Sequence, residues 1–184
     1  HIHLIVCCLR PHSISRFMQF VEGRSAQQYN TRKKRKGAFW EDRYFCTMIQ
    51  NGRYLWNCLR YIDLNMMRAG VVLHPSEWVW CGYSEFMGLR VRYRILDIPT
   101  LLVMLGFSDV ENARKFYRED IALHSSAGDM KRRPVWTESL AVGDRAFVAA
   151  MKKRIPRMRT YSTKDETFAG ADIWSIKEKK RPYT

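Results

Sequence analysis

Two histidines at the start of the chain have a spacing that suits metal binding. His1 and His3 belong to HIHLIVCCL, residues 1–9, a run of branched apolar residues that predicts a strand. Side chains two positions apart on a strand point the same way, so both imidazoles can reach one metal ion. An imidazole pair with open positions for oxygen ligands suits Mn²⁺ or Mg²⁺ better than a closed zinc site. The plainer alternative is that the HxH pattern arose by chance.

A tyrosine and an amide lie one turn apart in RYIDLNMMRAGVV, residues 60–72. We predict a helix from about Arg53 to Met67, ended by Gly70. At 100° per residue, Tyr61 and Asn65 fall on one border of the apolar stripe of this helix. Taken alone, such residues are usually a core-edge tyrosine and a cap. The predicted stripe consists of Tyr54, Leu55, Cys58, Leu59, Ile62 and Met66.

The strand and the helix that hold these residues belong to a mixed pattern of elements. Both faces of residues 1–9 are apolar beyond the histidines, which predicts a central strand covered on both sides. A change of composition near residue 90 predicts that the second part of the chain is all-helical. The sequence after residue 155 is polar and basic and has no sustained periodicity. The other predicted elements are a helix over 13–29, a basic loop over 31–37, a strand over 39–49, an ordered loop over 74–86, and helices over 97–105, 110–123 and 144–155.

The charge of the chain indicates a polyanionic partner. Thirty-two Lys and Arg against eighteen Asp and Glu give a net charge of +14, which favours nucleic acid over acidic membrane surfaces. No run of eighteen apolar residues exists, so we expect no membrane span. The five cysteines form no CxxC pair and fall mostly in apolar runs, which predicts reduced, buried thiols. We therefore expect a cytoplasmic protein without structural zinc.

Two basic clusters are candidate phosphate-binding surfaces. The first precedes Trp40 and Arg43, lies between the two candidate chemical motifs, and consists of Arg32, Lys33, Lys34, Arg35 and Lys36. The second consists of Lys152, Lys153 and Arg154, followed by Arg157 and Arg159. Such cations neutralise phosphates, and an exposed Trp40 can stack on an unpaired base. The alternatives are solvated charged surfaces and a Trp40 that belongs to the core.

Four segments resemble, in the same order, the REP-associated tyrosine transposases, which are single-tyrosine, IS200-like members of the HUH nucleases. HIHLIV resembles their histidine–hydrophobic–histidine strand, and RYIDLNMMRAGVV resembles their tyrosine helix. FMQFVEGRSAQQYNTRKKRKGAFWEDRYF is similar to their helix, basic loop and strand, and HPSEWVWCGYSEF to the loop that follows. The resemblance is close over residues 1–88, and VGDRAFVAAMKKRI loosely resembles a basic C-terminal helical segment.

The resemblance implies a fold, an activity and a set of site residues. The fold is α+β: a ferredoxin-like antiparallel sheet with helices on one face over residues 1–90, then a basic helical extension over 91–184. By this resemblance we expect Tyr61 to be the nucleophile and His1, His3 and Asn65 to bind Mg²⁺ or Mn²⁺. The substrate is single-stranded DNA beside a repeat hairpin, cleaved and rejoined through a 5′-phosphotyrosine intermediate. Arg68 lies near the tyrosine border and joins the two basic clusters as a DNA-binding residue.

Two departures from the family pattern leave alternatives open. Family members more often have Asn-Pro where this chain has Asn65-Met66, and they carry a strand before the histidine strand, so we expect an incomplete sheet. The alternatives are a related HUH replication initiator or relaxase, a catalytically impaired repeat-binding protein, and an RNA-binding ferredoxin-like domain. A bacterial, nucleoid-associated protein that is a monomer or a homodimer fits the resemblance.

Overall fold

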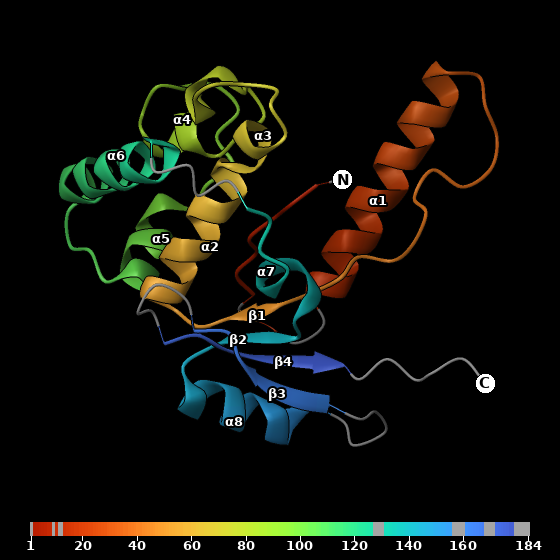
Figure 1. Ribbon diagram of the computed structural model, residues 1–184. Coiled ribbons are helices and arrows are strands. Elements are labelled where there is room, and N and C mark those ends of the chain that lie inside the picture. The colour runs from red at the N-terminus through yellow and green to blue at the C-terminus, as the bar shows by residue number, and fades with distance from the viewer. Residues whose placement is uncertain are drawn as a thin grey trace. The chain divides into compact units, whose positions relative to one another are not determined.

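The chain forms two compact units, residues 1–46 and residues 47–184. Figure 1 shows the computed structural model, which describes residues 2–8, 10, 13–126, 131–155, 161–167 and 172–178. The domain boundary predicted near residue 90 lies at another place in the chain, and it stays a prediction. Of the helices within these ranges, none is long and apolar enough to cross a membrane.

The first unit contains one long helix and segments without regular secondary structure. Helix α1, Ser13–Arg32, confirms the predicted helix and extends it by one turn. The following segment packs on this helix, because the Trp40 indole donates a hydrogen bond to the Glu22 carbonyl at 3.0 Å and the Phe39 and Tyr29 rings lie 4.6 Å apart. The predicted strand over 39–49 is therefore mostly wrong, and the pairing residues are Met48–Ile49, which form β1 at the start of the second unit.

The predicted strand at the histidines is also wrong. Residues 2–8 have no regular secondary structure and pair with no strand. Leu4 and Ile5, which would lie on opposite faces of a strand, are 52% and 40% exposed, so the expected cover on both faces is lacking. Cys7 and Cys8 are exposed as well, so the expected burial of these thiols is wrong. A strand depends on hydrogen bonds to a neighbouring strand, which branched residues favour but cannot supply. The apolar pattern therefore indicated a propensity to form a strand, but not the presence of a partner strand.

The sheet belongs to the second unit and is mixed. Its order is β1-β2-β4-β3, where β2 is Ala141–Gly143, β3 is Tyr161–Asp165 and β4 is Trp174–Glu178. The pair β1–β2 is parallel and the pairs β2–β4 and β3–β4 are antiparallel. The α+β class is thus confirmed, but the expectations of a fully antiparallel sheet and of an all-helical C-terminal part are wrong. Short polar strands such as YSTKD carry no apolar alternation that would reveal them.

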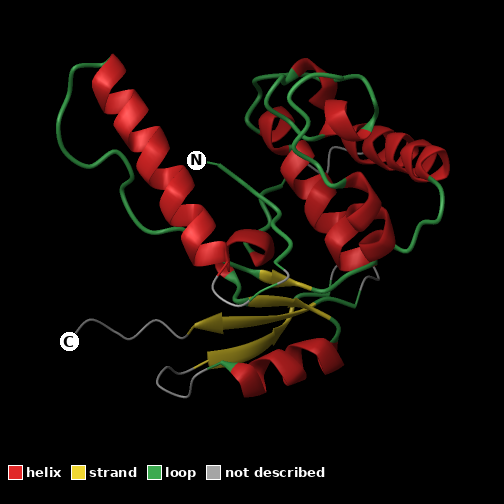
Figure 2. Cartoon of the chain, turned by 180° about the vertical axis from the view of Figure 1, so that it is seen from behind, coloured by secondary structure: helices red, strands yellow, loops and turns green. Residues whose placement is uncertain are grey.

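Helices cover both faces of this sheet, whereas one covered face was predicted. Ala141 and Ile176 pack against α8, Arg145–Arg154, while Val142 packs with α2, Arg53–Asp63, and α7, Val135–Glu138. Successive strand residues point to opposite faces, which explains how neighbours 141 and 142 serve two cores. Figure 2 shows the same sheet from behind, with α8 on its lower face.

The remaining helices form a second core on the far side of α2. This core joins Leu64 and Phe86 to Tyr117 and Ile121. Predicted helices 53–67, 97–105, 110–123 and 144–155 are confirmed to within three residues at their ends, although the first is interrupted at Leu64. The elements are α3 (Asn65–Arg68), η1 (Pro75–Glu77), α4 (Tyr83–Phe86), α5 (Ile98–Leu105) and α6 (Val110–Ser126). Gly70 has φ 69°, which a glycine adopts without strain, and it follows the end of α3.

Candidate active site

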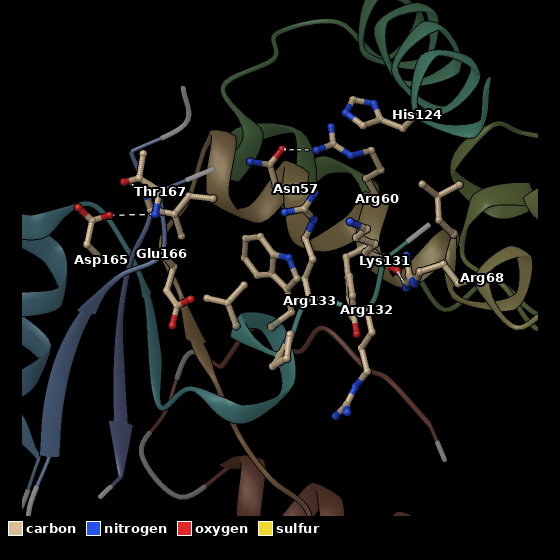
Figure 3. A pocket seen from close by; sticks show the side chains of 16 residues that line it. Asn57, Arg60, Arg68, His124, Lys131, Arg132, Arg133, Asp165, Glu166 and Thr167 are labelled. Carbon is tan, nitrogen blue, oxygen red and sulfur yellow. Dashed lines mark hydrogen bonds between the residues drawn. The ribbon is translucent and has the colours of Figure 1, made fainter. Parts of the chain in front are cut away.

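A pocket of about 600 Å³ in the second unit contains Tyr61 in its wall. Helix α2 contributes Asn57 and Arg60 to the same wall, and α6 contributes His124 (Figure 3). The other lining residues are Leu64, Arg68, Lys131, Arg132, Arg133, Pro134, Val135, Trp136, Asp165, Glu166, Thr167 and Ile173. The pocket thus lies where α2 meets the segment before α7 and the end of β3.

Tyr61 is more buried than its predicted border position implies. The residue is 8% exposed and packs with Tyr54, Cys58 and Trp136, whose ring centroid lies 6.5 Å from that of Tyr61. Because cores form on two sides of α2, its buried face is wider than the predicted stripe. Tyr61 therefore combines a packed ring with a place in the pocket lining.

A guanidinium lies directly against the tyrosine ring. The Arg68 Cζ atom is 4.1 Å from the Tyr61 ring centroid, which is a close cation–π contact. Arg68 Nη2 also donates to the Tyr61 carbonyl oxygen and, at 3.4 Å, to Asn65 Oδ1. Arg68 thereby connects the predicted nucleophile with the predicted metal ligand, and the prediction that it lies near Tyr61 is confirmed.

The pocket lining has an excess of positive charge. Arg60, Arg68, Lys131, Arg132 and Arg133 are five cations, against the two acids Asp165 and Glu166. Arg60 is neutralised by both carboxylate oxygens of Asp120, each at 2.8 Å.

The acids of the lining are engaged locally as well. Glu166 forms an ion pair with Lys177 at 2.7 Å. Asp165 accepts from the Thr167 backbone, and hydrogen bonds from Thr167 lower the pKa of the Asp165 carboxyl. The lining thus remains more basic than acidic, with its acids held by neighbouring groups.

The residues 131–133 were missed by the sequence reasoning, as were Arg60 and His124. The tetrapeptide KRRP could have indicated them, because three consecutive basic residues before Pro134 concentrate positive charge in a short segment. Arg132 is exposed and forms an ion pair with Glu138 at 2.9 Å, an exchangeable surface contact. What the sequence could not show is that this run meets α2 across about seventy residues of chain.

The predicted metal ligands occupy different parts of the chain. His3 is half-buried in the first unit, Asn65 begins α3 in the second, and His1 lies outside the described residues. Asn65 Oδ1 accepts a long hydrogen bond of 3.4 Å from Arg68, which it can exchange for a cation, so Asn65 fits the donor set. Among the described residues, no group of three or more His, Cys, Asp or Glu could hold a metal ion. The mixed set of His1, His3 and Asn65 stays a prediction.

The predicted DNA-binding clusters are exposed but lie outside the pocket lining. Residues 32–36 lie at the end of α1 and in the turn after it, and residues 152–154 form the last turn of α8. Arg43 is exposed, whereas Trp40 is half-buried and packs on α1, so it is neither fully exposed nor part of a buried core. Arg157 and Arg159 lie outside the described residues.

Asp63, two residues after Tyr61, is held in a closed network. This residue is 7% exposed, and its oxygens accept the Cys81 thiol at 2.8 Å and the Tyr117 hydroxyl at 2.6 Å. Burial raises the pKa of Asp63, while the two donors oppose that shift. Both carboxylate oxygens thus have partners from other elements, and Asp63 links α2 to α6.

Comparison with known proteins identifies the class of the N-terminal segment. Residues 1–65 match the family described as transposase IS200-like, which confirms the resemblance in this part of the chain. The match includes both histidines, Tyr61 and Asn65, and ends before the residues 131–133. No curated protein and no solved structure matches the chain.

Proposed function

We propose that the protein is a transposase that cleaves and rejoins single-stranded DNA, with Tyr61 as its nucleophile. The observation that carries this proposal is the position of Tyr61 in a pocket lined by five cations and two acids. The family match over residues 1–65 supports a transposase, and the net charge of +14 supports a nucleic-acid substrate.

The proposed reaction transfers a phosphoryl group to the tyrosine. The Tyr61 Oη atom attacks phosphorus in line, an O–P bond forms, and the P–O3′ bond breaks. The phenol proton passes to water, and the leaving 3′-oxygen takes up a proton as it becomes a free hydroxyl. Attack on the 5′-phosphotyrosine by another 3′-hydroxyl reverses these steps and rejoins DNA, so no external energy source is needed.

The cations of the pocket suit the charge that this reaction develops. A phenol has a reference pKa of about 10 and is a weak nucleophile at neutral pH, so the phosphate must be made a better electrophile. Arg68 and Lys131 line the pocket, and in this proposal they would donate hydrogen bonds to phosphate oxygens that gain charge in the transition state. The contact of Arg68 with the Tyr61 ring also fixes the direction of the tyrosine side chain.

A divalent ion completes the proposed site. His1, His3 and Asn65 would hold Mg²⁺ or Mn²⁺, because two imidazoles and an amide oxygen leave positions open for oxygen ligands. When bound, the ion would polarise the scissile phosphate. Variants His3→Ala and Asn65→Ala should then lose cleavage that depends on Mn²⁺ while they retain DNA binding.

The proposed substrate is a repeat hairpin with unpaired nucleotides at its foot. The exposed clusters at residues 32–36 and 152–154 would contact its phosphates, and the protein would act in the bacterial cytoplasm as a monomer or homodimer. The second candidate is a repeat-binding protein that has lost catalysis. The low exposure of Tyr61, 8%, favours this candidate, because a nucleophile must reach its phosphate.

A covalent-adduct assay separates the two candidates. Wild type and Tyr61→Phe are incubated with single-stranded hairpin DNA and Mn²⁺, and the products are resolved under denaturing conditions. The proposal expects a protein–DNA adduct from wild type and none from Tyr61→Phe. Binding without any adduct from wild type would favour the second candidate, and an adduct from Tyr61→Phe would show that another residue is the nucleophile.

A further inference from the structure

The segment LRVRYRIL, residues 89–96, alternates apolar residues with arginines and has no place in the proposed active site. Such alternation is typical of a strand, yet the segment forms no strand in the structure. Its apolar side chains are exposed instead, with Leu89 at 67%, Val91 at 71% and Ile95 at 82%. A charged and apolar segment that is neither buried nor paired is a candidate for binding a partner.

A buried carboxylate fixes both ends of this segment. Glu85 is 3% exposed, and Arg90 Nη2 donates to its Oε2 at 2.7 Å. The backbone N–H groups of Ile95 and Leu96 donate to its other oxygen, each at 2.7 Å. Burial alone would raise the pKa of Glu85, but these donors outweigh it and hold the pKa below its usual value. The carboxylate therefore stays charged at neutral pH and closes a loop from residue 90 to residue 95.

The tip of the closed loop carries a tyrosine between two arginines. Arg92 and Arg94 are exposed, and Tyr93 is 85% exposed with φ 57°. A tyrosine rarely adopts this left-handed conformation, which costs conformational energy that fixed loop ends can support. Within the described residues, no hydrogen bond or ion pair engages the side chains of these three residues. The tip thus presents an aromatic face and two cations to solvent.

A second exposed aromatic residue lies next to a residue that is hydrogen-bonded to Arg90. Trp80 is 81% exposed, and it follows Val79, whose carbonyl accepts a hydrogen bond from Arg90 Nη1 at 3.0 Å. Arg90 therefore holds both the loop and the turn that carries Trp80. Exposed aromatic rings interleaved with arginines form the usual platform for unpaired nucleotides, because every base offers a face for stacking and every linkage a phosphate.

We infer that the loop of residues 90–95 binds single-stranded DNA outside the Tyr61 pocket, with Tyr93 stacked on a base and Arg92 and Arg94 on flanking phosphates. The inference rests on the proposed function for the identity of the nucleic acid as DNA. Paired DNA is a poorer fit, since its base faces are already stacked and the tyrosine ring would have to displace a neighbour. The loop would hold unpaired nucleotides next to the hairpin foot.

Equilibrium binding in the Tyr61→Phe background tests this inference without any cleavage. The probe is a fluorescent single-stranded oligonucleotide, compared with the same sequence as a duplex. Loss of one base-stacking contact predicts that Tyr93→Ala weakens single-strand binding roughly 5- to 100-fold, with a smaller effect on the duplex. Tyr93→Phe should bind as the parent does. Tyr93→Asn should match Tyr93→Ala, since asparagine tolerates the left-handed backbone and preserves the loop.

The arginines are tested by the dependence of binding on salt. Arg92→Ala with Arg94→Ala should reduce the slope of log K against log salt by about 1.4, from about 0.7 per phosphate contact on single strands. The matched control replaces Lys115 and Lys164, two exposed cations on α6 and β3, and should leave the slope nearly unchanged. Unchanged binding by Tyr93→Ala, or equal losses for single strand and duplex, would overturn the inference. The adduct assay judges the proposed function separately, so the two failures are distinguishable.

Discussion

Tyr61 and Asp63 are two residues apart in the same motif, yet they face different parts of the molecule. Asp63 points into the core between α2 and α6, where both of its oxygens accept hydrogen bonds from other side chains. Tyr61 belongs to the core on the sheet side and to the wall of a basic pocket. The helix is thus fixed on one side by a closed polar network and presents its candidate nucleophile on the other.

The difference separates a structural polar residue from one that we propose to be functional. A buried polar group with complete partners contributes to stability and specificity of packing. A polar residue beside excess charge in a pocket contributes little to stability, and such sites are where catalysis is found.

The largest expected effect is on stability. Asp63→Ala should lower the free energy of unfolding by about 2–4 kcal/mol, because it removes two hydrogen bonds and leaves the buried Tyr117 hydroxyl without its acceptor. Tyr61→Phe should cost less than about 1.5 kcal/mol, since the ring and its packing remain. Urea unfolding of both variants measures the difference. A larger loss from Tyr61→Phe would reverse the proposed roles.

On the pocket side, the largest expected effect comes from Arg68. Arg68→Gln should slow adduct formation about 100-fold, because it removes a cation beside the reacting phosphate. Single-turnover rates with saturating DNA measure this effect separately from binding. Arg68→Lys should recover part of the rate, since the charge returns without the planar contact on Tyr61. Equal rates for wild type and Arg68→Gln would place Arg68 outside the reaction.

Two basic triplets distinguish the pocket from the remaining charged surface. Alanine at Lys131, Arg132 and Arg133 should reduce the salt slope of single-strand binding by up to about 2, at about 0.7 per phosphate contact. Alanine at Lys152, Lys153 and Arg154 removes the same charge from α8, outside the pocket lining, and is the matched control. We expect the pocket triplet to have the larger effect. The opposite order would favour the α8 cluster as the main phosphate contact.

The smallest expected effect is on the pH dependence of stability. Burial raises the pKa of Asp63 above its unfolded value of about 3.9, so the folded state holds the proton more tightly. The resulting stabilisation is complete below the unfolded pKa and is lost as pH rises through the folded pKa. The free energy of unfolding of wild type, relative to Asp63→Asn, should therefore fall as pH rises through this window. A difference that grows with pH would indicate a pKa lowered by Cys81 and Tyr117.

Local patterns predicted the longer helices, but they did not predict the short helices α4 and α7 or the sheet. Residues such as Asp97 and Asp144 cap their helices by accepting the Thr100 and Phe147 backbone N–H groups, signals that are complete within four residues. The strands β2, β3 and β4 are three to five residues long, and their pairing depends on contacts between distant segments. The histidine run illustrates the converse, a strong strand pattern without a partner strand.

The site residues that lie close together in the sequence could be predicted, and those that come from distant segments could not. Tyr61, Asn65 and Arg68 lie within eight residues, and the structure joins Arg68 to the other two. The contribution of Lys131, Arg132 and Arg133 depends on how the chain returns to α2 after α6, which the sequence does not encode locally. The depth of Tyr61 was mispredicted for the same reason, since the core that buries it is formed with α7 and the sheet.

Peptide mapping of the covalent adduct tests the central claim most directly. Trypsin cleaves after Arg60 and Arg68, so Tyr61 is released in the peptide YIDLNMMR, where it is the single tyrosine. After reaction with single-stranded hairpin DNA and nuclease trimming, we expect this peptide to carry the mass of a 5′-phosphonucleotide on Tyr61. An adduct on any other peptide, or a reacted wild-type protein whose YIDLNMMR peptide is entirely unmodified, would contradict the account.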